Sequence, residues 1–272
     1  MGTAAQAEEA AAGWGWVTIR AKVEDGGRWH VRAVGRRRAL GLLAGGVLAG
    51  GASAAAPAPI RLAGNPAWYP YSWEEGDQLH GLGMDRATAA LTRLGLPYVL
   101  QTYGLWQRAL AALSHGQVDL LISSVWNPAR TERLLYTEPY ARDDVRAFVR
   151  IDDVGLYHGV ADLLGRGRPA PLGVAPLGSA YGPDMDALEA RGLRLERSGT
   201  TEGMLQRVRY GRADFCVLVH QNGRHLLRTL GLTSVLAPLP FPLAPLQVRM
   251  LMRRDGPLVG RINAFNTLIA TA

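Results

Sequence analysis

Short apolar runs alternate with amphipathic segments from residue 60 onward. The hydrophobic positions predict strands at 60–63, 98–100 and 118–123, and helices with apolar residues at helical spacing at 84–94 and 105–114. The same succession returns further along the chain. Its second copy has strands at 172–175, 193–195 and 213–219 and helices at 183–190 and 201–210. This alternation favours an α/β fold with buried, parallel strands.

The two halves share a short signature at the end of a helix. Gly116 and Asp119 in the first half correspond to Gly211 and Asp214 in the second, and an apolar run follows in both. A glycine at this place is typical of a helix that ends in the left-handed conformation. We therefore expect two similar lobes, each a β-α-β-α-β sheet.

Two extended segments are expected to connect these lobes. One is 145–150, and the other is 248–252, which follows a proline-rich stretch. The last helix, at 258–269, would then pack on the first lobe. The predicted organisation is a first lobe of residues 57–147 plus 246–272 and a second lobe of residues 148–245. Two crossings between α/β lobes form a hinge around a ligand cleft.

The segment 1–56 has the organisation of an export signal. Three arginines at 36–38 precede a weakly apolar stretch, and small residues at 52–54 fit a cleavage site near Ala54. Paired arginine before leucine resembles a twin-arginine signal, and an ordinary secretory signal is the alternative. We therefore expect a periplasmic protein. We also expect translation to begin inside this segment at one of two valines, Val31 or Val34.

The net charge of +7 does not indicate a nucleic-acid partner. Residues 1–56 hold seven basic and four acidic residues, and the remaining 216 hold 23 basic and 19 acidic ones with no dense basic run. The basic character is therefore spread over the chain. An apolar fraction of 48% is enough for a packed core. The one long uncharged stretch, 39–56, is too short and too isolated for a multi-span membrane protein.

Aromatic residues gather after the predicted strands of the first lobe. All four tryptophans beyond residue 56 fall in three such loops: Trp68, Trp73, Trp106 and Trp126. Such clustering favours an aromatic-lined pocket. Arg130 follows the third strand end, where a guanidinium can clamp a carboxylate bidentately. A surface ion pair with Glu132 or Glu138 is the alternative. Gly178 and Ser179, at the matching strand end of the second lobe, can hold the other side of the anion.

His220 stands at the end of the last predicted strand of the second lobe, 213–219, four residues after Cys216, so we expect the two side chains to share one strand face. His220 can contact a ligand, respond to pH, act as an acid or base, or only cap the strand. Its expected partners come from the opposite lobe: Glu74, Glu75 and Asp77. Cys216 is the single cysteine and stands in an apolar run, so we interpret it as a core residue and expect no disulfide and no metal site.

Five blocks together carry a family resemblance. They are Tyr69-Pro70-Tyr71-Ser72-Trp73, Gly81-Leu82-Gly83-Met84-Asp85, the Gly-x-x-Asp unit at 116–119, Asn127-Pro128-Ala129-Arg130 and Tyr136-Thr137-Glu138-Pro139-Tyr140. Over about residues 60–268 they resemble the bacterial extracellular solute-binding proteins of the polar amino-acid uptake type, family 3. The most specific part is the last two blocks together, Arg130 followed by the string Tyr136-Thr137-Glu138-Pro139-Tyr140. The resemblance implies a two-lobed, Venus flytrap receptor that delivers a small carboxylate-bearing, amino-acid-like ligand to an ABC-type permease of the inner membrane.

The resemblance also implies which residues contact the ligand. Arg130 falls at the carboxylate-binding arginine. The other implied contacts are Tyr71, Trp73, Trp106, Ser123, Ser124, Gly178 and Ser179, to which we add His220. The sequence departs from the family at Val219, where an aspartate usually pairs with the ligand's ammonium group, so the sequence leaves the ligand's identity open.

We therefore predict a monomeric binding protein rather than an enzyme, with no catalytic residues, no cofactor, no metal and no nucleic-acid partner. The sequence holds none of the motifs G-x-x-x-x-G-K-[ST], H-E-x-x-H and G-x-S-x-G. Two alternatives stay open. One is a dehydratase-like enzyme on the same fold, and the other is a receptor without a transporter that partners a membrane sensor or a redox enzyme.

Overall fold

The computed structural model describes residues 20–24, 28–32, 57–166, 169–197 and 199–271. The chain forms two compact units, 1–55 and 56–272. In the first unit, β1 (Arg20–Glu24) and β2 (Arg28–Arg32) pair antiparallel. Three predictions lie outside the described residues: the arginine triplet at 36–38, the cleavage site near Ala54 and the translation start at Val34.

Three parallel strands organise the first lobe of the second unit. They are β3 (Ile60–Ala63), β7 (Tyr98–Leu100) and β8 (Leu120–Val125), with β3 in the middle. The helices are α1 (Leu82–Arg93), α2 (Trp106–Ser114) and α7 (Ile262–Thr271). Alternate residues of β8 face opposite sides of the sheet, so Leu120 and Ile122 pack with α1 whereas Leu121 packs with α2. The predicted strands and helices of this lobe are confirmed, with ends that move by one or a few residues.

The second lobe repeats this plan. Its parallel strands are β11 (Gly173–Ala175), β12 (Leu195–Arg197) and β13 (Phe215–Val219). Its helices are α3 (Val160–Leu163), α4 (Pro183–Ala190), α5 (Thr201–Arg209) and α6 (His220–Thr229). The sequence analysis missed α6 because its polar first turn directly follows a buried strand. His220 therefore begins a helix, and the prediction that it shares a strand face with Cys216 is wrong.

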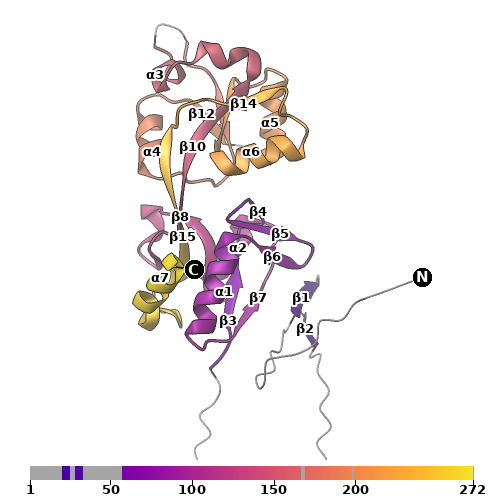
Figure 1. Ribbon diagram of the computed structural model, residues 1–272, viewed down its shortest axis with the longest axis vertical. Helices are drawn as coiled ribbons and strands as arrows, with labels where there is room; N and C mark the ends of the chain where they lie inside the picture. Colours follow the sequence, from indigo (N-terminus) through magenta and orange to yellow (C-terminus); the bar gives the residue numbers. More distant parts are fainter. Residues whose placement is uncertain (1–19, 25–27, 33–56, 167–168, 198, 272) are drawn as a thin grey trace, which may run out of the picture. The chain divides into compact units, whose positions relative to one another are not determined.

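Two long strands run from one lobe into the other (Figure 1). They are β10 (Ala141–Arg150) and β15 (Ala244–Arg253), and they pair antiparallel from Ala141–Val248 to Val145–Ala244. These are the two predicted crossings. The short strands β9 (Leu134–Tyr136) and β14 (Leu236–Pro238) pair with β15 and β10 respectively. The result is one ten-stranded mixed sheet of order β12-β11-β13-β10-β15-β8-β3-β7, with β14 and β9 at the side of this path.

A small antiparallel sheet replaces the first predicted loop. Its strands are β4 (Ala67–Trp68), β5 (Ser72–Glu75) and β6 (Gln78–His80). Strands of two to four residues are too short to show a period-two pattern in the sequence. Trp68 and Trp73 therefore lie in strands and Trp106 begins α2, so of the four tryptophans beyond residue 56 only Trp126 lies in a loop as predicted.

The repeated Gly-x-x-Asp signature has the same structural role in both lobes. Gly116 and Gly211 both have positive φ angles, 72° and 68°, which glycine adopts without steric cost. The Asp119 carboxylate accepts the backbone N–H of Arg61 at 3.0 Å and its guanidinium at 2.8 and 2.7 Å. Asp214 accepts the backbone N–H of Leu172 at 2.7 Å. Each aspartate thus ties its own strand to the first strand of the lobe.

The last helix packs on the first lobe, as predicted. Phe265 and Ile269 of α7 are buried in the cluster that contains Leu91 of α1. The Arg86 guanidinium of α1 donates to the carbonyl oxygen of Ile269. Three 3₁₀ turns complete the fold: η1 (Pro128–Arg130), η2 (Ile151–Leu156) and η3 (Val259–Arg261). In the part of the chain that the structure describes, no helix is both long and apolar enough to cross a membrane.

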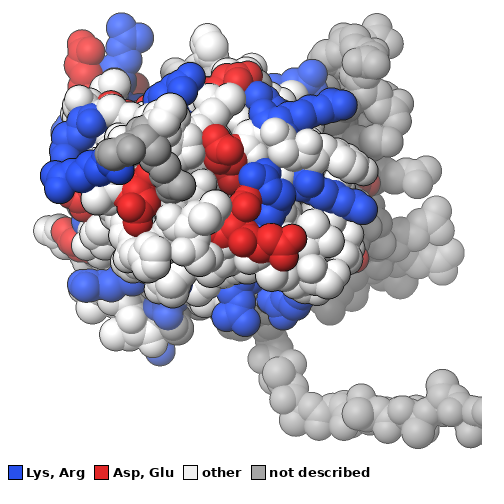
Figure 2. All heavy atoms as spheres, turned by 90° about the horizontal axis from the view of Figure 1, so that it is seen from above, with Lys and Arg blue, Asp and Glu red and all other residues white. Residues whose placement is uncertain are grey.

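Charged side chains of both signs are interspersed on the face shown in Figure 2. Some of the exposed charges form close pairs on the second lobe. Arg197 donates to both carboxylate oxygens of Glu189, at 2.7 and 2.6 Å, and Arg207 donates to Glu196 in the same bidentate way. Exposed pairs of this kind contribute little to stability because water and salt screen them.

Candidate functional site

Arg130 is the last residue of the 3₁₀ turn η1, which follows β8 after Trp126 and Asn127. The turn begins at Asn127, whose side-chain oxygen accepts the backbone N–H of Ala129 at 2.9 Å. The Arg130 guanidinium lies over the ring of Trp106, with Cζ 5.8 Å from the ring centroid. Among the described residues, no carboxylate lies within ion-pair distance of this guanidinium, and the alternative surface pair with Glu132 or Glu138 does not form.

Trp106 begins α2, and α2 meets the second lobe at its next residue. The side-chain N–H of Gln107 donates to the carbonyl oxygen of Leu177 at 2.9 Å. Leu177 stands in the turn after β11, next to Gly178 and Ser179, and Gly178 has a φ of 73° there. The structure therefore brings four of the predicted residues into one region between the lobes: Trp106, Arg130, Gly178 and Ser179.

Ser123 and Ser124 occupy the end of β8 and are both buried. Because β8 alternates, Ser123 faces the same side of the sheet as Leu121, which is the side that α2 covers. Its hydroxyl oxygen is buried and, among the described residues, has no hydrogen-bond partner. Ser124 faces the other side, and its hydroxyl makes one long contact with the carbonyl oxygen of Val125 at 3.3 Å. Ser123 is therefore the serine that joins the region of Arg130 and Trp106.

Tyr71 belongs to a second group at the crossing strand β10. Its hydroxyl donates to Asp143 Oδ2 at 2.7 Å, and the backbone N–H of Gln221 donates to the same oxygen at 3.3 Å. Burial raises the pKa of Tyr71, and the neighbouring Asp143 carboxylate raises it further. Tyr71 thus links the first lobe to the crossing strand and to the start of α6.

His220 faces a carboxylate that the sequence analysis did not assign to it. Its Nδ1 lies 3.7 Å from Asp144 Oδ1, whereas Arg146 binds Asp144 bidentately at 2.7 and 2.9 Å. Burial lowers the pKa of His220, and the positive charge of Arg146 lowers it further, against the opposing effect of Asp144. Ligand atoms of Asp143, Asp144 and His220 lie within 4.8 Å of one another, a spacing that a metal ion can bridge. Arg146 already supplies a cation to Asp144, which disfavours a second one.

The predicted partners of His220 lie elsewhere in the structure. Glu74 accepts the backbone N–H groups of Tyr103 and Gly104, both at 3.1 Å, and so holds the turn that leads into α2. Glu75 and Asp77 are exposed. The prediction erred because the partners of His220 come from β10, which is distant in sequence from the β5–β6 hairpin. Cys216 is fully buried and burial raises its pKa to about 12, which confirms the interpretation as a core residue.

Trp73 belongs to a cluster of rings on the small β4–β6 sheet. Its ring contacts Tyr69 with centroids 5.0 Å apart and stacks on His80 at 5.7 Å. Tyr69 in turn stacks on His225 of α6, with centroids 4.0 Å apart and planes 15° apart. Tyr69 and His225 therefore join the two lobes. Sequence reasoning missed His225 because α6 was not predicted, although Tyr69 stands in one of the quoted blocks.

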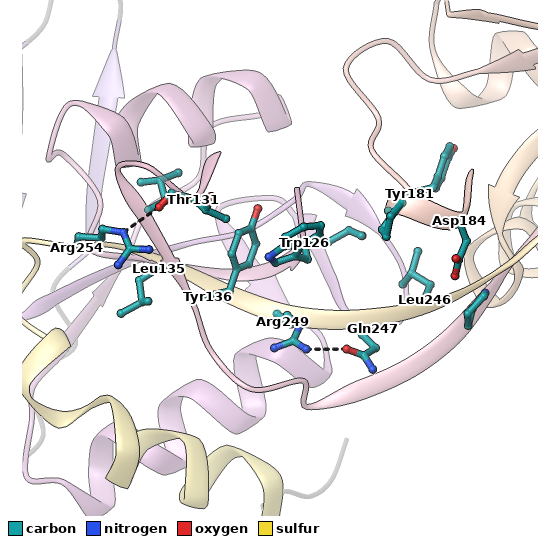
Figure 3. Close-up of a pocket in the computed structure, with 15 residues that line it drawn as sticks. Trp126, Thr131, Leu135, Tyr136, Tyr181, Asp184, Leu246, Gln247, Arg249 and Arg254 are labelled. Carbon is teal, nitrogen blue, oxygen red and sulfur yellow. Dashed lines mark hydrogen bonds between the residues drawn. The ribbon is translucent and has the colours of Figure 1, made fainter. Parts of the chain in front are cut away.

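A cavity of about 530 Å³ opens beside β15, with walls from both lobes (Figure 3). Its walls come from the end of β8 and the following loop, from β15 and from the start of α4. The lining residues are Val125, Trp126, Thr131, Leu134, Leu135, Tyr136, Tyr181, Gly182, Pro183, Asp184, Pro245, Leu246, Gln247, Arg249 and Arg254.

None of the nine predicted contact residues lines this cavity. Three lining residues are close neighbours of predicted ones in the chain: Val125 follows Ser124, Thr131 follows Arg130, and Tyr181 stands two residues after Ser179. The cavity therefore adjoins the region of Arg130 on its β15 side. Of the residues that sequence reasoning singled out, Trp126 and Tyr136 line the cavity.

The chain is similar to known proteins in sequence and in fold. The family described as bacterial extracellular solute-binding proteins, family 3, matches residues 60–267. The chain is similar to the Bordetella pertussis BvgS VFT2 domain, with 17% identity, 78% of this chain and 87% of that chain covered, and a TM-score of 0.63. It is also similar to holo ArgBP from T. maritima, with 16% identity, 77% and 88% coverage and a TM-score of 0.61.

A third similar structure is the GluR0 ligand-binding core in complex with L-glutamate. It is 14% identical over 78% of this chain and 91% of that chain, with a TM-score of 0.63. At these identities the solved structures show the two-lobed Venus flytrap fold. No curated protein matches the sequence.

Proposed function

Because the chain belongs to the bacterial extracellular solute-binding proteins of family 3, we propose that it captures a small carboxylate-bearing ligand between its two lobes. In this proposal Arg130 binds the carboxylate, Trp106 covers it, and the turn at Gly178 and Ser179 closes on it from the second lobe. The lobes then release the ligand unchanged.

The observation that carries this proposal is the guanidinium of Arg130. It is partly buried over Trp106 and has no carboxylate within ion-pair distance among the described residues. A guanidinium fork fits a carboxylate with two parallel hydrogen bonds. The unpaired Ser123 hydroxyl on the same side of the sheet supplies a further donor. A buried hydroxyl without a partner costs about 1–3 kcal/mol, which a ligand oxygen would recover.

Closure of the lobes is supported by contacts on both sides of this region. Gln107 reaches Leu177 on one side, and Tyr69 stacks on His225 on the other. A ligand that touches both lobes stabilises the closed arrangement over an open one by its differential affinity. The predicted contacts Tyr71, Trp73 and His220 belong in this proposal to the wall on the β10 side.

The partner and the location are further parts of the proposal. We propose an ABC-type permease of the inner membrane as the acceptor of the ligand and the periplasm as the location, after cleavage near Ala54 in the export-signal segment 1–56. A membrane sensor is the second candidate partner, since the similar structures include the BvgS VFT2 domain and a histidine kinase sensor domain. The proposed lobe limits 57–147 with 246–272 and 148–245 place both changes of lobe inside β10 and β15.

Titration calorimetry of the full chain with a panel of small carboxylates tests the receptor role. Loss of a charged, bidentate hydrogen bond costs about 1.5–3 kcal/mol, so Arg130→Ala should weaken binding by about 10- to 100-fold. Arg130→Lys keeps the positive charge but lacks the guanidinium fork. Its affinity should therefore lie between those of the original protein and Arg130→Ala. Arg133→Ala is the matched control, because Arg133 is exposed three residues further along.

Two outcomes contradict the proposal. Binding by Arg130→Ala as tight as by the original protein would remove Arg130 from the site. Conversion of the bound carboxylate to another compound, detected by mass spectrometry, would favour the dehydratase-like alternative, for which His220 beside Asp144 is the available acid–base pair.

A further inference from the structure

The cavity beside β15 has the size of a small-molecule site. Its volume of about 530 Å³ falls within the roughly 300–1,000 Å³ of typical ligand pockets. Its lining includes Thr131, the residue that follows Arg130 in the chain. The chemistry of the cavity walls therefore indicates the class of ligand, which the proposed function leaves undefined.

The walls of the cavity present rings and aliphatic groups. Trp126 is 38% exposed, although large aromatic side chains are usually more buried. The Tyr181 hydroxyl donates to the carbonyl oxygen of Val217 at 2.8 Å, so this hydroxyl is already engaged. Leu134 and Leu246 are buried beneath the surface of the cavity. In Figure 3, Trp126 and Tyr136 lie between Arg254 at one end and Tyr181 with Asp184 at the other.

The charges at the cavity favour an anion. Arg254 lies at its first-lobe end and Arg249 beside Gln247 near its middle, against the single carboxylate of Asp184 at its second-lobe end. Arg254 donates from Nε to the carbonyl oxygen of Thr131 at 2.9 Å, and no described carboxylate lies within ion-pair distance of it. Arg249 donates to Thr137 and Gln247, and its Nη1 lies 3.7 Å from the exposed carboxylate of Glu138. Its Nε is buried and, among the described residues, has no partner. Arg254 is therefore the cavity arginine without a carboxylate partner among the described residues.

The carboxylates near the cleft offer little to a ligand ammonium group. Asp143 already accepts hydrogen bonds from Tyr71 and Gln221, and Asp144 is bound bidentately by Arg146. Asp184 is exposed in the first turn of α4, where the helix dipole stabilises it and water surrounds it. An ammonium group between the lobes would therefore meet arginines without a dedicated acidic partner.

We propose that this cavity holds the apolar body of the ligand and that the ligand class is an aromatic monocarboxylate without an α-ammonium group. The ring lies against Trp126 and Tyr136, and the carboxylate reaches Arg130. This inference rests on the proposed function and deepens it. A zwitterionic amino acid with the same ring is the competing class.

A matched pair of probes separates these classes. 3-Phenylpropionate and L-phenylalanine differ by the α-ammonium group, and propionate lacks the ring. In titration calorimetry with the full chain, 3-phenylpropionate should bind at least about 10-fold more tightly than L-phenylalanine and than propionate. Trp126→Ala should weaken 3-phenylpropionate by about 10-fold without changing propionate. Trp126→Phe should restore most of the affinity, because it keeps a ring in place. Tyr210→Ala, which removes an exposed aromatic far along the chain, is the control and should change neither.

Three results overturn the inference. The first is tighter binding of L-phenylalanine, particularly if Asp184→Asn abolishes it. The second is an affinity for 3-phenylpropionate that Trp126→Ala leaves unchanged. The third is no binding of 3-phenylpropionate. If another carboxylate then binds in an Arg130-dependent manner, the proposed function stands and only the ligand class is wrong. If no carboxylate binds, both fail.

Discussion

Replacing Asp119 by alanine removes the anchor between two strands of the first lobe. The carboxylate holds three hydrogen bonds from Arg61, one from the backbone N–H at 3.0 Å and two from the guanidinium at 2.8 and 2.7 Å. The bonds also raise the pKa of Arg61. In the variant the backbone N–H of Arg61 keeps no charged acceptor, and the guanidinium turns to water.

The size of the expected loss of stability follows from the exposure of Asp119 and Arg61. The side chain of Asp119 is 5% exposed and that of Arg61 is 35% exposed, so the guanidinium pair is partly screened and counts for about 1 kcal/mol. The backbone bond to a charged acceptor adds about 1.5 kcal/mol. We therefore expect Asp119→Ala to lower the free energy of unfolding by about 2–3 kcal/mol. For a unit of this size, that loss lowers the Tm by about 5–10 °C.

Urea unfolding and calorimetry measure this loss. Asp214→Ala is the matched variant in the second lobe, and it should lose about half as much because Asp214 accepts one hydrogen bond, from Leu172. Asp255→Ala removes a carboxylate that is 82% exposed and should change the Tm little. Equal losses for Asp119→Ala and Asp255→Ala would refute the reasoning.

Two further predictions concern titratable side chains of the second lobe. Burial lowers the pKa of His220 below 6.5, so the unfolded chain binds its proton more readily. The contribution of His220 to stability is then fully present above about pH 6.5 and is lost as the pH falls below that value. His220→Gln should flatten the dependence of the unfolding free energy on pH below about pH 6.5, and an unchanged slope there would contradict this. Burial raises the pKa of Cys216 to about 12, so a thiol reagent at about pH 8 should modify it only after unfolding in guanidinium chloride. Rapid modification of the folded protein would show that the thiol is accessible.

The strands and helices of both lobes could be predicted because each buries an apolar face with a clear period. The same holds for the Gly-x-x-Asp repeat, since a left-handed glycine and a strand-anchoring aspartate are determined by neighbouring residues. Arg130 became a candidate in the same way, from a strand end and a helix start, and its guanidinium contacts the ring of Trp106, another candidate.

The remaining features depend on pairs that are distant in sequence. Asp143 and His220 meet because β10 pairs antiparallel with β13, with Val145 opposite Val219, and no local pattern reports that register. The stack of Tyr69 on His225 requires both the unpredicted β4–β6 sheet and α6. The cavity is a similar case, because its walls come from two lobes and β15 and none of them shows a motif on its own.

The antiparallel pairing of β10 with β15 limits how the two halves of this protein can part. Both strands are hydrogen-bonded into the one sheet that continues through both lobes. At these strands the lobes are therefore connected by sheet rather than by a flexible linker. Opening must be absorbed as a change of twist along two neighbouring ten-residue strands, which deform together and return elastically. Four residues of β15 also line the cavity: Pro245, Leu246, Gln247 and Arg249. A molecule bound there would therefore directly contact a strand whose twist resists opening.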